Sequence, residues 1–124
     1  MDDALVERVL RAVEAVPSGR VVAYGDIAGL VGTGPRQVGA VMAAHGHAVA
    51  WWRVVRADGT LPEHLLDRAR VRWRDEAIAT NASGTGCRIG RHRADLVHLA
   101  DRYESSTVDL ARPSRPRPPT GGTG

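Results

Sequence analysis

Residues 19–45, GRVVAYGDIAGLVGTGPRQVGAVMAAH, hold the pattern that decides the fold. Residues 21–24 form a short, β-prone stretch, which predicts a brief strand or an extended segment leading into the next helix. The apolar spacing of residues 25–31 predicts a short helix, which the glycines of residues 32–34 end. A proline at its first position suits a third helix over residues 35–45. Helix, glycine turn and helix form the outline of a helix-turn-helix, which many small helical domains share.

The outer face of this third predicted helix is nearly bare of side chains. Val38, Val41 and Met42 form its apolar side. The rest of the helix is small, with Gly39, Ala40, Ala43 and Ala44. Such a face suits either tight packing against a neighbouring helix or close approach to a DNA groove, with Arg36 at its N-terminal end.

The flanking segments complete a small, mainly α domain. Residues 4–16 carry one apolar stripe and predict a first helix, and residues 63–79 predict a fourth. The charge run on the fourth helix is typical of a solvated face. Between the last two helices, Asp58-Gly59 marks a turn, which predicts a short β-hairpin of Val54-Val55 with Thr60-Leu61. Residues 80–111 give weak signals, with a weak helix from Leu96 to Tyr103.

Composition excludes several classes of protein. Of 124 residues, 43% are hydrophobic and 25% charged, which is ordinary for a soluble globular protein. No apolar run approaches the roughly 20 residues that span a bilayer, and the N-terminus lacks the features of a signal peptide. The single cysteine, Cys87, excludes a disulfide framework and a multi-cysteine metal site. We therefore expect a cytoplasmic protein with no membrane contact, no metal and no cofactor.

Arginine alone carries the positive charge. The 17 basic residues include no lysine and face 14 acidic ones, for a net charge of +3. Planar guanidinium groups suit phosphate, so this balance permits binding to nucleic acid without demonstrating it.

Three segments in order resemble the DNA-binding domain of the O6-alkylguanine-DNA alkyltransferases. They are GRVVAYGDIA at residues 19–28, PRQVGAVM at residues 35–42, and WWRVV at residues 51–55 with the Asp-Gly-Thr of residues 58–60. The resemblance covers about residues 4–79. It implies a winged-helix-like fold whose helix-turn-helix enters the minor groove, and a guanine that is flipped out of the duplex into a pocket.

The sequence departs from the catalytic members of that family at their acceptor motif. Trp51 stands where the family has its acceptor cysteine, and Trp52 where it has the histidine that activates it. Alkyl transfer needs a thiolate, and an indole nitrogen cannot replace one because its lone pair belongs to the ring. Cys87 lies more than thirty residues further on and is interpreted as an incidental thiol. Tryptophan at the acceptor position is typical of the alkyltransferase-like proteins, which recognise O6-alkylguanine without repairing it.

The resemblance also implies a role for each matched residue. Tyr24 presses on the phosphate beside the lesion, and Arg36 enters the base stack to fill the gap. The remaining DNA-binding residues are Pro35, Gln37, Gly39 and Ala40. The implied lesion pocket holds Tyr24, Trp51, Trp52, Val54 and His64, with Arg68 one turn beyond. Arg53 is interpreted as a structural brace.

Two features depart from the family pattern. Ala50 replaces the usual proline before the tryptophan, and the loop over residues 60–64 is shorter than the pocket lid of the active enzymes. The range of alkyl groups that fit the pocket is therefore left open.

We expect a monomer in three parts. Residues 1–80 form the alkyltransferase-like DNA-binding domain, residues 81–104 a poorly defined basic extension, and residues 105–124 a disordered tail rich in Arg, Pro and Gly. The expected function is non-catalytic recognition of alkylated guanine in double-stranded DNA, with hand-over to nucleotide excision repair proteins. The alternatives are a winged-helix regulator that reads sequence, and a methyltransferase by family label.

Overall fold

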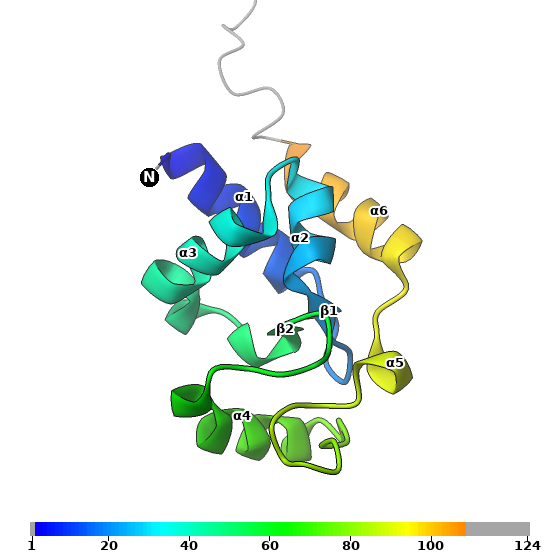
Figure 1. Ribbon diagram of the computed structural model, residues 1–124. Coiled ribbons are helices and arrows are strands. Elements are labelled where there is room, and N and C mark those ends of the chain that lie inside the picture. Colours follow the sequence, from blue (N-terminus) through cyan, green and yellow to red (C-terminus); the bar gives the residue numbers. More distant parts are fainter. Residues whose placement is uncertain (1, 109–124) are drawn as a thin grey trace, which may run out of the picture.

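The computed structural model describes residues 2–108, which form a mainly α fold with one small sheet (Figure 1). The mainly α class predicted from the sequence is confirmed. No helix in this range is both long and apolar enough to cross a membrane. The elements are α1 (Asp3–Glu14), β1 (Val22–Ala23), α2 (Tyr24–Val31), α3 (Pro35–His45), the 3-10 turns η1 (Gly46–Ala48) and η2 (Trp51–Arg53), β2 (Val54–Val55), α4 (Glu63–Asp75), α5 (Ile89–His92) and α6 (Leu96–Ser106).

Local signals position the first three helices. The Asp2 side chain caps α1 by accepting a hydrogen bond from the Ala4 N–H at 3.1 Å. Gly32 ends α2 in the left-handed conformation, with φ of 86°, which glycine adopts without strain. Pro35 occupies the first turn of α3, where its missing N–H costs no helical bond.

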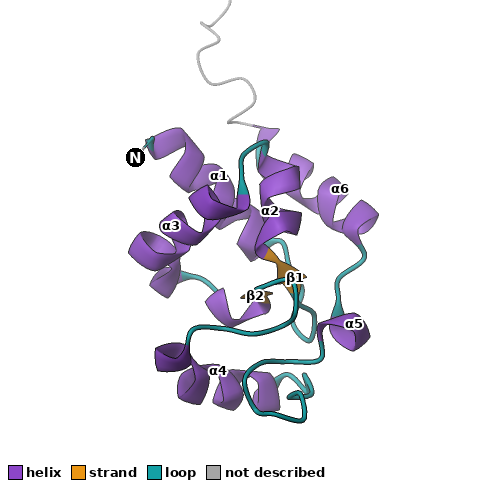
Figure 2. Ribbon diagram, viewed as in Figure 1, coloured by secondary structure: helices purple, strands orange, loops and turns teal. Residues whose placement is uncertain are grey.

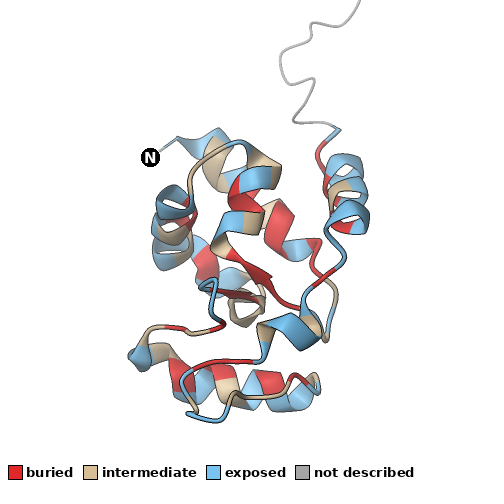
Figure 3. Cartoon of the chain, turned by 45° about the vertical axis from the view of Figure 1, so that its right-hand side comes forward, coloured by how far each residue is buried: buried red, intermediate tan, exposed pale blue. Residues whose placement is uncertain are grey.

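The core consists of two hydrophobic clusters on either side of the sheet. The first lies among α1, α2, α3 and α6, and the second lies between the sheet and α4. Val22 and Val54 belong to the first cluster, and Val21 and Val55 to the second, because successive strand residues point to opposite faces. Figure 2 shows the strands between the two helical layers, and Figure 3 shows the buried residues on the facing sides of those layers.

The strand pairing differs from the predicted β-hairpin. Val54-Val55 pairs in parallel with Val22-Ala23, in the register Val22 to Val54 and Ala23 to Val55. Thr60 instead forms an isolated antiparallel bridge with Gly86. The hairpin prediction was wrong because a turn signal such as Asp58-Gly59 specifies only that the chain reverses. Val54-Val55 pairs with the distant strand because both strands are buried between the two clusters there.

The segment after α4 packs on the core. The Asp95 side chain caps α6 by accepting from the N–H groups of Val97 and His98, at 3.0 and 3.1 Å. Leu99 and Tyr103 are buried in the first cluster. The segment expected as a poorly defined extension, 81–104, thus includes α5 and most of α6. The tail expected from residue 105 starts within α6, and its residues 109–124 lie outside the described range.

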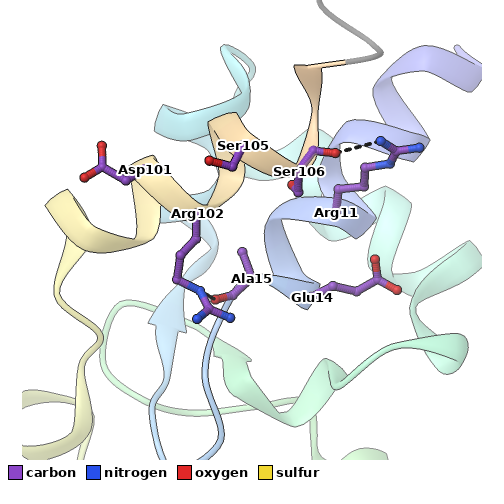
Figure 4. A pocket seen from close by; sticks show the side chains of 7 residues that line it. All are labelled: Arg11, Glu14, Ala15, Asp101, Arg102, Ser105 and Ser106. Carbon is purple, nitrogen blue, oxygen red and sulfur yellow. Dashed lines mark hydrogen bonds between the residues drawn. The ribbon is translucent and has the colours of Figure 1, made fainter.

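The ends of α1 and α6 are fastened to each other (Figure 4). Arg11 donates to the carbonyl oxygen of Ser106 at 2.8 Å, and Arg102 donates to that of Ala15 at 2.9 Å. Each arginine thereby satisfies a carbonyl at the C-terminal end of the other helix, where a positive charge also suits the helix dipole. An open hollow of about 620 Å³ lies between the two arginines, and the two hydrogen bonds beside it help to hold α6 on the fold.

Candidate nucleic-acid interface

The outer face of α3 is uncovered. Arg36, Gln37 and Ala40 are exposed, whereas Val38 and Val41 are fully buried beneath them. A Cβ added to Gly39 would meet no atom within 4 Å. Of the two interpretations of the bare face, packing against a neighbouring helix therefore has no support within residues 2–108, and the face is open to an external surface.

A hollow of about 500 Å³ adjoins this face. One wall is α3 with Tyr24 from the start of α2, and the other is formed by η2, the loop after β2, and α4. The uncovered face of α3 and a pocket large enough for a base thus lie side by side. Its lining residues are Tyr24, Gly39, Met42, Ala43, Gly46, His47, Trp51, Arg56, Leu61, Pro62, His64, Leu65 and Arg68.

The structure brings together only part of the pocket set predicted from sequence. Tyr24, Trp51 and His64 line the hollow. Val54 does not, because its side chain is fully buried in the sheet behind it. Trp52 is likewise absent from the lining, because its indole is directed to a different set of partners.

Glu76, the C-cap residue that follows α4, holds Trp52. One carboxylate oxygen accepts hydrogen bonds from the backbone N–H of Gly19 at 2.9 Å and from Nε of Arg53 at 3.0 Å. The other accepts from Nε1 of Trp52 at 2.9 Å and from Arg53 Nη2 at 2.7 Å. Arg53 also donates to the carbonyl of Val16 at 3.0 Å, in agreement with the bracing role expected for it. This carboxylate joins the loop after α1, the η2 turn and the end of α4.

The same carboxylate is kept ionised by its partners. Burial alone would raise the pKa of Glu76, but hydrogen bonds from Arg53, Gly19 and Trp52 outweigh it and hold the pKa below its ordinary value. Glu76 was interpreted from sequence as part of a solvated charge run on the fourth helix. That interpretation was wrong for this residue, because a tertiary contact with η2 covers it.

Several contacts hold the tryptophan pair in place. Trp52 accepts a hydrogen bond on its backbone oxygen from Nε1 of Trp73 at 2.8 Å, and the Arg72 guanidinium lies 4.7 Å from its ring centroid. Trp51 meets Trp52 edge to face, with centroids 5.7 Å apart, and Arg68 lies 5.8 Å from the Trp51 ring. Such contacts fix ring orientation, so Trp51 forms a rigid, half-buried wall of the pocket.

The pocket is cationic. None of the described residues that line it is Asp or Glu, while Arg56 and Arg68 contribute positive charge. Burial raises the pKa of the Tyr24 hydroxyl, against the opposing effect of Arg56. Tyr24 therefore stays protonated at neutral pH and can donate a hydrogen bond. The sequence did not indicate Arg56 as a pocket residue, because its place before the Asp58-Gly59 turn suggested only a loop.

Cys87 lies apart from this pocket. Its side chain is buried in the second cluster and is not among the lining residues. Burial raises the pKa of the thiol to about 11, so at neutral pH it is protonated and a poor nucleophile.

Comparison with known proteins agrees with this geometry. Residues 4–79 match the family model for the DNA-binding domain of 6-O-methylguanine DNA methyltransferase. A DNA base-flipping protein of Escherichia coli (strain K12) is 37% identical over 89 residues, covering 68% of this chain and 69% of that protein. A DNA base-flipping protein of Shigella flexneri matches equally well.

Solved structures give the same result. Atl1 of S. pombe, in complex with damaged DNA containing O6-carboxymethylguanine, superposes with a TM-score of 0.66 at 26% identity, over 77% of this chain and 98% of that one. S. pombe ATL in complex with DNA gives 0.56 at 28% identity, over 80% and 95% of the two chains. The chain therefore belongs to the 6-O-methylguanine DNA methyltransferase family, on the evidence of its DNA-binding domain.

Proposed function

We propose that this protein binds double-stranded DNA through the outer face of α3, in the minor groove, and flips an O6-alkylguanine into the adjoining hollow without removing the alkyl group. The observation that carries the proposal is the position of the roughly 500 Å³ hollow directly beside the uncovered helix face. The neighbours solved with damaged DNA and the relatives named base-flipping proteins support it.

Two residues perform the flip in this proposal. Tyr24, at the edge of the pocket, donates its hydroxyl to the phosphate beside the lesion. Arg36, at the exposed start of α3, enters the stack where the base has left it. Extrusion costs a few kcal/mol of stacking and pairing, and a planar guanidinium recovers part of this by stacking and by hydrogen bonding to the orphaned base. Pro35, Gln37, Gly39 and Ala40 complete the contact with the groove.

In this proposal the pocket recognises the base without transferring its alkyl group. In the family resemblance Trp51 takes the place of the acceptor cysteine, and its ring offers an apolar face to the alkyl carbon. Leu61 and Pro62 line the same side of the pocket as Trp51, opposite α3, and His64 and Arg68 supply polar contacts at its rim. The thiol of Cys87 is protonated and outside the pocket, so no nucleophile is placed at the alkyl carbon.

A protein that leaves the alkyl group in place must act through other proteins. We propose that the bound, flipped complex is handed to nucleotide excision repair, and that the protein works as a monomer in the cytoplasm, associated with the nucleoid when DNA-bound. A monomer is sufficient because the helix face and the pocket both belong to one chain.

Fluorescence anisotropy tests the recognition step. Two duplexes that differ only in one O6-methylguanine are compared at about 0.15 M salt, near physiological ionic strength. We expect at least tenfold preference for the lesion, which corresponds to about 1.4 kcal/mol. Equal affinity would contradict the proposal and leave a groove-binding protein without lesion recognition, such as a regulator that reads sequence.

Incubation with a duplex radiolabelled on the O6-methyl group tests the absence of transfer. We expect the label to remain on the DNA after denaturation of the protein. Label on the protein would identify an alkyltransferase, and the variant Cys87→Ser would then show whether that thiol is the acceptor.

A further inference from the structure

A small loop beyond the matched domain has no role in the function proposed above. Residues 80–88, called the clamp below, follow the last residue of the family match, residue 79. The clamp does not line the pocket, yet it touches the loop that does. We propose that the clamp is a positioning element that sets the place of Leu61 and Pro62, and thereby the width of the lesion pocket. The inference rests on the proposed function.

Backbone contacts join the clamp to the pocket loop. The N–H of Cys87 donates to the carbonyl of Gly59 at 2.9 Å, and the N–H of Leu61 donates to the carbonyl of Thr85 at 3.4 Å. Between them, Thr60 and Gly86 form an antiparallel bridge. The residues joined, 59–61, come directly before Pro62 in the chain.

The two backbones approach so closely that glycine is required on both sides. A Cβ on Gly59 would lie 2.2 Å from the carbonyl oxygen of Cys87. A Cβ on Gly86 would lie 2.2 Å from the carbonyl oxygen of Gly59 and 2.6 Å from the Cα of Thr60. These are backbone atoms, which cannot rotate away as the end of a side chain can. Any side chain at either position must therefore separate the clamp from the loop.

The clamp is itself firmly built. The Asn81 side-chain oxygen accepts from the N–H groups of Thr85 and Gly86 at 3.0 and 3.3 Å, and the Asn81 N–H donates to the Gly86 carbonyl at 2.9 Å. Arg70 of α4 donates to the carbonyl of Gly84 at 2.8 Å. The clamp is thus tied to α4, which provides one side of the pocket.

The pocket loop depends on these contacts for its position. Its internal bonds, such as the N–H of Gly59 to the carbonyl of Arg56 at 2.8 Å, fix its shape but attach it to nothing else. The side chains of Leu61 and Cys87 are buried together in the second cluster, at 3% and 1% exposure. Separating Gly86 from Gly59 therefore shifts Leu61 and Pro62 on the side of the pocket that they share with Trp51, while α3 on the opposite side is untouched.

The variant Gly86→Ala tests this inference, and Gly90→Ala is its matched control, because a Cβ at Gly90 meets nothing within 4 Å. Affinities of the full chain for duplexes with and without O6-methylguanine are measured beside hydrogen exchange of the Leu61 and Cys87 amides. For Gly86→Ala we expect faster exchange at both amides and at least a fivefold loss of lesion preference, with affinity for the plain duplex within twofold. Gly90→Ala should match the unsubstituted chain.

A second variant covers the case in which Gly86→Ala does not fold. Arg70→Ala removes the bond to the Gly84 carbonyl from the α4 side and leaves the close backbone contact sterically intact. We expect a smaller loss of lesion preference, about twofold to threefold, with Arg74→Ala on the same helix as its control.

The outcomes separate the two proposals. Faster exchange in a folded variant with unchanged lesion preference would overturn the positioning role of the clamp and leave the proposed function standing. Unchanged exchange in Gly86→Ala would also overturn it. No lesion preference in the unsubstituted chain would overturn the proposed function itself, and with it the clamp as an element of lesion selection.

Discussion

The two walls of the pocket are built in opposite ways. The α3 wall is made by leaving side chains out: Gly39 and Ala43 line it, and nothing in the described chain lies over its outer face. The tryptophan wall is made by adding contacts, since Trp52, Arg53 and Glu76 satisfy one another's polar atoms and Trp51 packs against that set. A surface that must approach DNA closely benefits from small residues, whereas a surface that must keep a base-sized space benefits from rings held rigidly in place.

The tryptophan wall should be the more costly to break. In Glu76→Ala the Arg53 guanidinium, only 17% exposed, loses its counter-charge, and the Trp52 and Gly19 N–H groups lose their acceptor. Removing one member of a buried pair leaves an uncompensated charge, so we expect a loss of about 3 kcal/mol in the free energy of unfolding, measured by urea denaturation.

Asp67→Ala is the control for Glu76→Ala. Asp67 also pairs with an arginine, Arg70 at 2.8 Å, but its side chain is 99% exposed. Exposed pairs contribute little, so we expect a change below about 0.5 kcal/mol. Equal losses in the two variants would show that the Glu76 network does not hold the tryptophan wall.

A larger side chain on the α3 wall should weaken binding to DNA without lowering the stability of the fold. A Cβ at Gly39 meets no atom within 4 Å in the free protein, and in Gly39→Leu leucine also favours a helix more than glycine does. Its side chain would project into the DNA groove, so we expect affinity for duplex DNA to fall about thirtyfold, which is about 2 kcal/mol, with no loss of thermal stability.

Gly90→Leu provides the comparison for Gly39→Leu. Gly90 lies in α5, away from α3 (Figure 1), and also has open space around its Cα. We expect its DNA affinity to equal that of the unsubstituted chain. A similar loss in both variants would show that α3 is not the DNA-binding face.

The start of α3 should affect discrimination more than affinity for plain DNA. Arg36→Ala removes the group proposed to fill the gap left by the flipped base. We expect lesion preference to fall about tenfold, about 1.4 kcal/mol, in the anisotropy assay. Arg74→Ala, an exposed arginine of α4 outside the pocket lining, should reduce both affinities alike or not at all.

The smallest expected effect is a pH dependence next to the clamp. Nε2 of His92 accepts a hydrogen bond from the Ala79 N–H at 3.0 Å, and burial, followed by the charges of Arg91 and Arg20, lowers the pKa of His92 below its ordinary value of 6.5. The neutral form is therefore favoured in the folded state. Its stabilising contribution is complete above pH 6.5 and is lost as the pH falls through the folded pKa.

Urea denaturation between pH 5 and pH 7.5 checks this dependence. We expect His92→Gln, which cannot titrate, to flatten the decrease in stability seen below pH 6.5, and the exposed His98→Gln to leave it unchanged. The Glu76 carboxylate does not contribute in this range, because its pKa lies below its ordinary value of 4.5. An unchanged slope in His92→Gln would show that the hydrogen bond to Ala79 carries none of the dependence.

Features that depend on neighbours along the chain could be predicted from the amino-acid sequence. Asp26 near the start of α2, Gly32 at its end and Pro35 at the start of α3 each act through backbone groups within four residues. The spacing of Val38 and Val41 likewise fixes which side of α3 is buried. These signals are local, so the helix-turn-helix and its bare face could be predicted correctly.

The contacts between distant segments could not be predicted in this way and became visible in the folded chain. The tertiary structure gave Val54-Val55 a parallel partner at Val22-Ala23, turned Trp52 away from the pocket toward Glu76, and packed α6 on α1. It also brought Gly86 against Gly59. Each of these contacts joins residues more than twenty positions apart, where periodicity and capping carry no information and the choice of partner depends on which arrangement buries apolar surface and satisfies polar groups together.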